Sequence, residues 1–114
     1  MKIFNYRDVR AENAEEESRG LNVRWLITRE TGAENFAMRL FEMAPNGFSP
    51  LHSHPWEHEV FILEGNGAVT NGKEEKEFKE GDVIFIPSNE RHQLKNAGKV
   101  IVKFLCLIPH ENEL

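Results

Sequence analysis

Short apolar stretches separated by turn-forming residues dominate the chain from residue 21 onward. Glycine and asparagine recur between these stretches, as at Pro45-Asn46-Gly47 and Asn71-Gly72, and both residue types accept the backbone angles of tight turns. The stretches alternate apolar and polar residues and are too short for amphipathic helices. The expected strands are residues 22–28, 36–43, 58–63, 67–70, 76–78, 82–86, 91–95 and 100–107. Many short strands with regular turns predict an all-β sandwich or barrel.

Length and charge limit what else the chain can be. Its 114 residues suffice for one hydrophobic core but not two, so we expect a single domain over residues 1–114, with an irregular segment at 1–20. The net charge of −5 argues against nucleic-acid binding. The longest apolar run, Phe104 to Ile108, is too short for a membrane span or a signal peptide. We therefore expect a soluble cytoplasmic protein that binds neither nucleic acid nor membrane.

Strand alternation assigns the side chains of the last expected strand to two faces. Lys103 should face water, so Val102, Phe104 and Cys106 should share the inner face. Cys106 would then either line a cavity or fill the core. As the only cysteine in the chain, it also excludes an intrachain disulfide and an all-cysteine metal site.

The strand expected at 36–43 contains two charged residues of opposite parity, Arg39 and Glu42. One of them should point inward, and Arg39 is the better candidate because Glu42 lies near the strand end, where solvation is easy. An inward arginine could hold a carboxylate or phosphate group of a substrate, or it could belong to a structural ion pair.

Four histidines form the most unusual pattern in the sequence. His52 and His54 are separated by one residue, so in an extended segment both side chains project from the same face. His58 follows four residues later, and His92 lies near the start of a late strand. Neutral imidazole binds Zn, Cu, Fe and Ni, and availability also admits Mn. The pattern therefore predicts a site for one divalent transition metal.

Other residues near this pattern leave alternatives open. Glu57 and Glu59 flank His58 and could be ligands, partners of a histidine N–H group, or exposed side chains. A fifth histidine, His110, lies in a polar tail and should be solvated. Four histidines could also close a purely structural tetrahedral zinc site.

Two segments resemble the sequence motifs of the cupin family, which folds as a jelly-roll β-barrel, also called a double-stranded β-helix. The first motif, with its H-x-H sequence, a further ligand position and a closing glycine, is matched by His52-Ser53-His54, His58 and Gly65. The second motif is matched, at the usual spacing, by Gly81, Pro87, His92 and Asn96. Asn46, followed by Gly47, and Asn89 replace two glycines of these motifs, and asparagine tolerates the left-handed conformation.

The string HSHPWEHEVFILEG resembles a subgroup of small cupins with an all-histidine, manganese-binding site. The resemblance covers roughly residues 36–108. It implies one divalent metal per chain (Mn or Fe favoured over Zn, Ni or Cu) held by four ligands, His52, His54, His58 and His92, with Glu59 as the alternative to His58. It also implies a homodimer, which would cover the outward-facing apolar residues Phe61 and Leu63.

The resemblance and the residues together favour a metal-dependent oxidoreductase of the dioxygenase or oxygenase type, acting on a small organic molecule. Its substrate pocket would be formed by the inward-facing and rim residues Arg39, Trp56, Val60, Ile62, Leu94, Phe104 and Cys106. Trp56 would either gate the barrel mouth or pack on its rim. The alternative is an isomerase or lyase whose metal acts as a Lewis acid on a sugar-like or anionic substrate. A further alternative is a cupin that binds a small ligand without catalysis.

Overall fold

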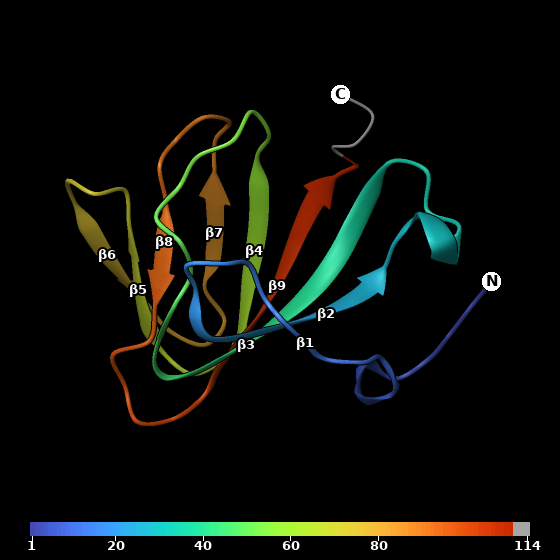
Figure 1. The fold of residues 1–114 in the computed structure, drawn as a ribbon, viewed down its shortest axis with the longest axis horizontal. Coiled ribbons are helices and arrows are strands. Elements are labelled where there is room, and N and C mark those ends of the chain that lie inside the picture. The colour runs from blue at the N-terminus through green and yellow to red at the C-terminus, as the bar shows by residue number, and fades with distance from the viewer. Residues whose placement is uncertain (111–114) are drawn as a thin grey trace.

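Antiparallel strands form one continuous sheet that curls around the core (Figure 1). The computed structural model describes residues 1–110. The elements in chain order are η1 (Tyr6–Asp8), β1 (Glu12–Asn13), β2 (Arg19–Ile27), η2 (Arg29–Thr31), β3 (Phe36–Phe48), β4 (His58–Glu64), β5 (Gly67–Thr70), β6 (Glu75–Phe78), β7 (Val83–Ile86), β8 (Gln93–Lys95) and β9 (Val102–Pro109). The sheet order is β6-β5-β8-β3-β9-β4-β7, with β2 pairing to β1 and β3. Neither 3-10 helix among these residues is long or apolar enough to cross a membrane.

Each expected strand corresponds to an observed one, β2 to β9, so the all-β prediction is confirmed. The predicted turn at Pro45-Asn46-Gly47 is wrong, because β3 continues through it to Phe48. Asn46 takes a left-handed φ of 65°, which lets the strand bend from its pairing with β9 towards β8. The N-terminal segment is also less irregular than expected, since it contains η1, β1 and the first residues of β2.

Side-chain alternation in β9 and β4 separates the core from the outer surface. Val102, Phe104 and Cys106 are buried on the inner face of β9, as predicted. On β4, the inner face carries Val60 and Ile62, and the latter is fully buried. These side chains belong to one hydrophobic cluster that fills the barrel below its histidine-bearing end.

Buried Asn96 connects the loop after β8 to β3. Its side-chain amide donates to the carbonyl oxygens of Met43 (3.0 Å) and Val100 (2.8 Å), and its Oδ1 accepts from the Gly98 amide (3.0 Å). The side chain is only 1% exposed, so water cannot replace these partners. The asparagine of the second motif is therefore a structural residue in this fold.

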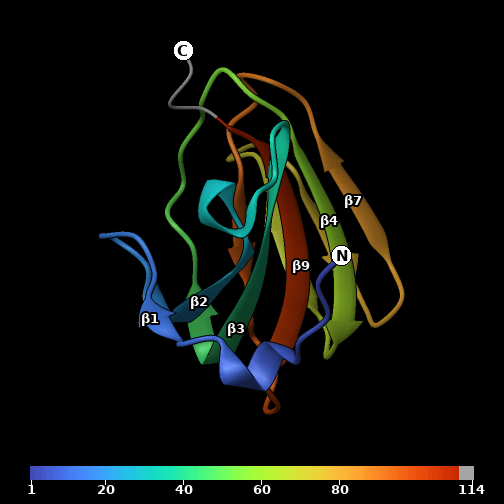
Figure 2. The same cartoon turned by 90° about the vertical axis from the view of Figure 1, so that its right-hand side faces the viewer.

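The outer face of β4 and β7 is apolar and exposed; the two strands lie side by side in Figure 2. Phe61 and Leu63 of β4 are 43% and 41% exposed, and Val83 and Phe85 of β7 are 73% and 57% exposed. The outward positions predicted for Phe61 and Leu63 are confirmed. Strand β7 ends the sheet, so its outer edge is unpaired.

Replacing Asn96 with alanine should destabilise the fold by about 2–4 kcal/mol, because the change leaves buried carbonyl and amide groups without partners. Urea unfolding measures this loss. Asn71→Ala is the matched control: its Oδ1 accepts from the amides of Lys73 and Glu74 in an exposed turn, so its loss should cost about 1 kcal/mol or less. Equal losses in the two variants would contradict the structural role of Asn96.

Candidate metal centre

Backbone pairing brings two distant parts of the chain together at one end of the barrel. His52 and His92 form an isolated antiparallel bridge, in which the His52 amide donates to the His92 carbonyl (3.2 Å) and the His92 amide to the His52 carbonyl (2.9 Å). The His54 carbonyl accepts from the Asn89 amide at 2.7 Å. Asn89 has a φ of 69°, so the left-handed conformation expected at this position is present.

Four imidazole rings converge where these segments meet β4. Potential ligand atoms of His52, His54 and His92 all lie within 4.8 Å of one another. His58, the first residue of β4, adds a fourth ring, with its centroid 4.5 Å from that of His54 and 4.9 Å from that of His92. Its Nε2 lies 2.8 Å from Nε2 of His54. The three-histidine cluster and the adjacent His58 thus form one group.

Each ring has an outer contact at its Nδ1 atom. In His54 and His92 this nitrogen faces the carbonyl oxygens of Trp56 (3.3 Å) and Glu90 (2.9 Å), respectively. In His52 it lies 3.5 Å from a carboxylate oxygen of Glu15. A carbonyl or carboxylate at Nδ1 favours a proton there, which leaves the Nε2 lone pair available to the cluster.

His58 differs because its Nδ1 contacts sulfur and a guanidinium group. Nδ1 lies 2.9 Å from Sγ of Cys106 and 3.4 Å from an amino nitrogen of Arg39. With its proton on Nε2, His58 donates to Nε2 of His54. With the proton on Nδ1, the ring donates to Sγ, and the Nε2 lone pair turns to the cluster. The second tautomer is the one that could bind a metal.

The imidazoles are held neutral. Burial lowers the pKa of His52, His54 and His92 below the ordinary value of 6.5. For His58, burial and then the charge of Arg39 lower the pKa to about 2. Neutral imidazole is the form that binds metals, so deprotonation costs these ligands nothing near pH 7.

The donor set fits a divalent transition metal. Two nitrogens bound at right angles about 2.1 Å from one ion lie about 3 Å apart, close to the separation of the His54 and His58 Nε2 atoms. Imidazole nitrogens suit Zn, Cu, Fe and Ni and are poor ligands for Ca or Mg. Four neutral ligands would leave the full charge of the ion available to a substrate.

Trp56 supports His54 rather than the cavity. Its ring stacks on the His54 imidazole with centroids 4.3 Å apart and planes 4° apart, and its carbonyl contacts Nδ1 of the same residue. The structure shows Trp56 packed against the core cluster, and its role as a gate stays a prediction.

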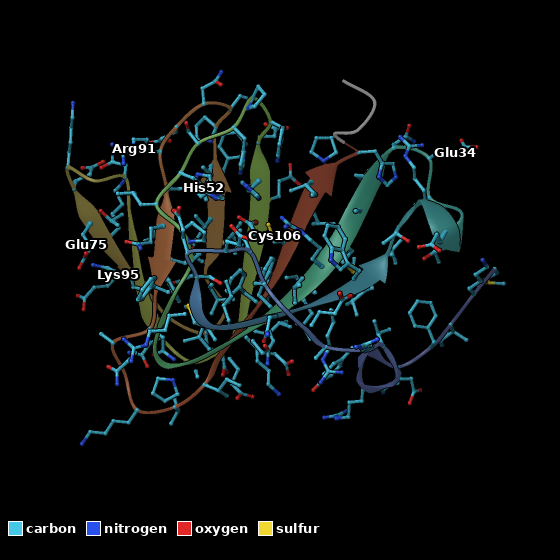
Figure 3. All side chains as sticks on the ribbon, viewed as in Figure 1. Glu34, His52, Glu75, Arg91, Lys95 and Cys106 are labelled. Carbon is cyan, nitrogen blue, oxygen red and sulfur yellow. The ribbon has the colours of Figure 1, made fainter. Side chains whose placement is uncertain are left out.

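A small cavity of about 40 Å³ lies beside the cluster, and Figure 3 labels two residues that line it, His52 and Cys106. Five of the predicted pocket residues line it: Arg39, Val60, Leu94, Phe104 and Cys106. Ile62 does not, because it is fully buried in the core. Arg39 is only 6% exposed, so the prediction that it points inward is confirmed, whereas Glu42 bonds Arg24 on the other face.

Of three glutamates near the histidines in sequence or in space, two are exposed on the outer surface and one lines the cavity. Glu59 follows His58 on β4, so its side chain faces the outer surface, away from the rings, and Glu57 is also exposed. Glu15 was not among the predicted site residues, yet it lines the cavity and contacts His52. The sequence does not single out Glu15, because nothing in it distinguishes this residue from its neighbours Glu16 and Glu17.

The fifth histidine, His110, lies outside the cluster, with its Nε2 3.0 Å from the Ala33 carbonyl oxygen.

Comparison with known proteins gives a consistent result. The family model described as "Cupin domain" matches residues 39–108. The structure of the polyketide cyclase RemF from Streptomyces resistomycificus superposes with a TM-score of 0.92 and 35% identity, covering 97% of this chain and 80% of RemF.

Two further relatives match part of this chain, and their names differ from that of RemF. An oxalate-binding protein of Thermotoga maritima is 35% identical over 61% of this chain and 61% of its own length. A 1-methylthio-D-xylulose 5-phosphate methylsulfurylase of Rhodospirillum rubrum is 32% identical over 67% of this chain. The match spans about half of the latter relative, 49% of its length.

The metal-free protein should lose stability as the pH falls below 6.5. Between that value and the folded pKa of about 2, His58 binds a proton in the unfolded chain only, so stability falls by about 1.4 kcal/mol per pH unit for this residue alone. His58→Gln should therefore show a slope shallower by that amount. Urea unfolding in chelator between pH 6 and 4.5 measures both slopes, and parallel slopes would contradict the buried neutral imidazole.

Proposed function

Because the chain belongs to the cupin family, we propose that it is a metal-dependent enzyme whose ion acts as a Lewis acid on an oxygen of a small organic substrate. His52, His54, His92 and His58 would hold the ion, with Mn or Fe as the natural metal. The observation that carries this proposal is the convergence of four neutral imidazoles beside a buried guanidinium. With an ion bound, such a site would place the charges of the ion and the guanidinium near a substrate oxygen, and both would stabilise negative charge on it.

The chain's own residues have separate tasks in this proposal. When bound, the ion would supply Lewis acidity towards an oxygen of the substrate. The outer contacts at Nδ1 of His54 and His92 hold those rings in position. Arg39 adds a fixed positive charge, and the apolar walls formed by Val60 and Phe104 exclude water and strengthen both interactions.

The names of two relatives fit the proposed Lewis-acid chemistry. RemF is a polyketide cyclase and is 35% identical over almost the whole chain. The name of the Thermotoga relative records binding of oxalate, a small organic anion. Both names agree with a site that binds and activates oxygen-bearing carbon compounds.

The second candidate is an oxidoreductase of the dioxygenase or oxygenase type. The apolar cavity wall favours it, because dioxygen is small and apolar and would enter such a space readily. A neutral all-nitrogen ligand set would also stabilise the divalent state of Mn or Fe. The two candidates differ in whether the metal must change its oxidation state.

Hydrogen exchange distinguishes them. Under anaerobic conditions, we expect the zinc-loaded and the manganese-loaded protein to exchange the protons next to a carbonyl for deuterium in D₂O, because polarisation of the carbonyl acidifies them enough for solvent to remove the proton and return a deuteron. The probes are pyruvate and dihydroxyacetone, followed by proton NMR. His92→Ala should lose both the metal and the exchange, since it removes one of the three clustered ligands.

Two other results would contradict this function. Consumption of dioxygen that requires Mn or Fe, with no exchange by the zinc protein, would favour the oxygenase. Probe binding without exchange or oxygen uptake would leave a non-catalytic ligand-binding cupin. Asn71→Ala, in an exposed turn, is the matched control for the mutational effect.

We also propose that a second copy of this chain covers the outer face of β4 and β7. The cross-strand pair Phe61 and Val83 forms an exposed apolar patch on that face, continued by Phe85 next to the free edge of β7. A protein that remained monomeric would leave this patch in water. Association of two such faces buries apolar surface on both.

Light scattering after gel filtration should therefore show a dimer for the wild type and a monomer for Phe85→Lys, because a charged side chain in the patch opposes its burial against a second copy. Val100→Lys is the control, since Val100 is equally exposed (58%) but lies after β8. A wild-type monomer, or a dimer that persists in Phe85→Lys, would contradict the proposed interface.

A further inference from the structure

Arg39 is a buried cation with no carboxylate in ion-pair contact among residues 1–110. The residue is 6% exposed, and its printed polar contacts are an Nη2 bond to Sγ of Cys106 (3.1 Å) and the 3.4 Å contact with Nδ1 of His58. Its Nε is buried and has no hydrogen-bond partner. None of the ion pairs found within residues 1–110 includes Arg39.

This arrangement is costly unless something else completes it. A guanidinium group remains charged at any pH at which a protein is folded, and burial of an unpaired charge costs several kcal/mol. The thiol and the imidazole are neutral partners, and the rings of Phe41 (4.9 Å) and Trp25 (5.4 Å) supply only cation–π contact. Glu15 lines the same cavity, but its carboxylate contacts His52 and forms no ion pair with Arg39, so an anionic ligand would supply the missing partner.

The size of the cavity limits which anion fits. Its volume of about 40 Å³ holds about three water-sized groups. A carboxylate has three heavy atoms, whereas a phosphate has five arranged as a tetrahedron. The space that Arg39 shares with the histidines therefore suits a carboxylate, while the remainder of a larger molecule would extend towards the barrel mouth.

We propose that Arg39 determines substrate specificity by binding the carboxylate of a small organic acid that has a second oxygen on the adjacent carbon. His58 lies between the guanidinium and the other imidazoles, so that second oxygen would reach the cluster while the carboxylate remained on Arg39. The inference rests on the proposed function, because it names the class of molecule that the same site would take.

Glycolate and glycolamide are a matched pair of probes, since they share one shape and differ in charge. Calorimetry on chelator-treated and manganese-loaded protein measures both affinities. We expect the wild type to prefer glycolate by about 10- to 100-fold, the effect of a charge-assisted hydrogen-bonded pair. The preference should fall by that factor in Arg39→Met, while manganese per chain stays unchanged. Inorganic phosphate should not compete.

Two further variants keep the test decisive. Arg39→Met should fold, because an apolar side chain replaces an unpaired buried charge. If it does not, Arg39→Lys keeps the charge but loses the planar group, and should retain a preference weaker than that of the wild type. Cys106→Ser should retain the full preference, since the sulfur contacts Arg39 but is not the proposed anion site.

The outcomes separate this inference from the proposed function. Normal manganese binding with no Arg39-dependent preference would overturn the carboxylate site alone. A preference that depends on Arg39 in protein that binds no manganese would support the carboxylate site and contradict the metal enzyme. If Cys106 absorbs as a thiolate at 240 nm and the protein shows no preference for glycolate, the thiolate itself is the negative charge that neutralises Arg39. That result would overturn the inference.

Discussion

Strand alternation on the inner face of β3, β4 and β9 is the constraint on which both the core and the site depend. On β4 the inward positions run from His58 through Val60 to Ile62, so the metal-site end and the apolar core are one continuous surface. Cross-strand register places Cys106 of β9 opposite Arg39 on one side and Val60 on the other. A shift of one residue in any of these strands would move the site to the outside.

The burial that stabilises the barrel also prepares its chemistry. Removal of water lowers the pKa of all four histidines, which keeps them neutral and able to bind a metal. The same environment leaves Arg39 charged and short of partners. The proposed preference of the site for anionic oxygen rests on these neutral metal ligands and this buried cation.

Much of this arrangement follows from local rules in the sequence. The two-residue period of strands predicted that Arg39 and Cys106 face inward, and both are buried. The motif spacing predicted that His52 and His92 belong to one site, and the two residues pair in the structure. Other features depend on contacts between distant segments. The bend at Asn46 looked like a turn because the same left-handed residue serves either role, and only the pairing of β3 with β8 decides. Glu15 lies between β1 and β2 and contacts His52, a contact between distant parts of the chain that no local pattern encodes.

The proposed chemistry depends on the binding of one transition-metal ion by the imidazole cluster. A crystal structure of manganese-loaded protein, with anomalous scattering recorded at the manganese edge, would reveal that ion. We predict one anomalous peak per chain, bonded to the Nε2 atoms of His52, His54, His58 and His92 at about 2.0–2.3 Å. An empty cluster in protein exposed to excess metal, or a peak bonded through other side chains, would contradict the account.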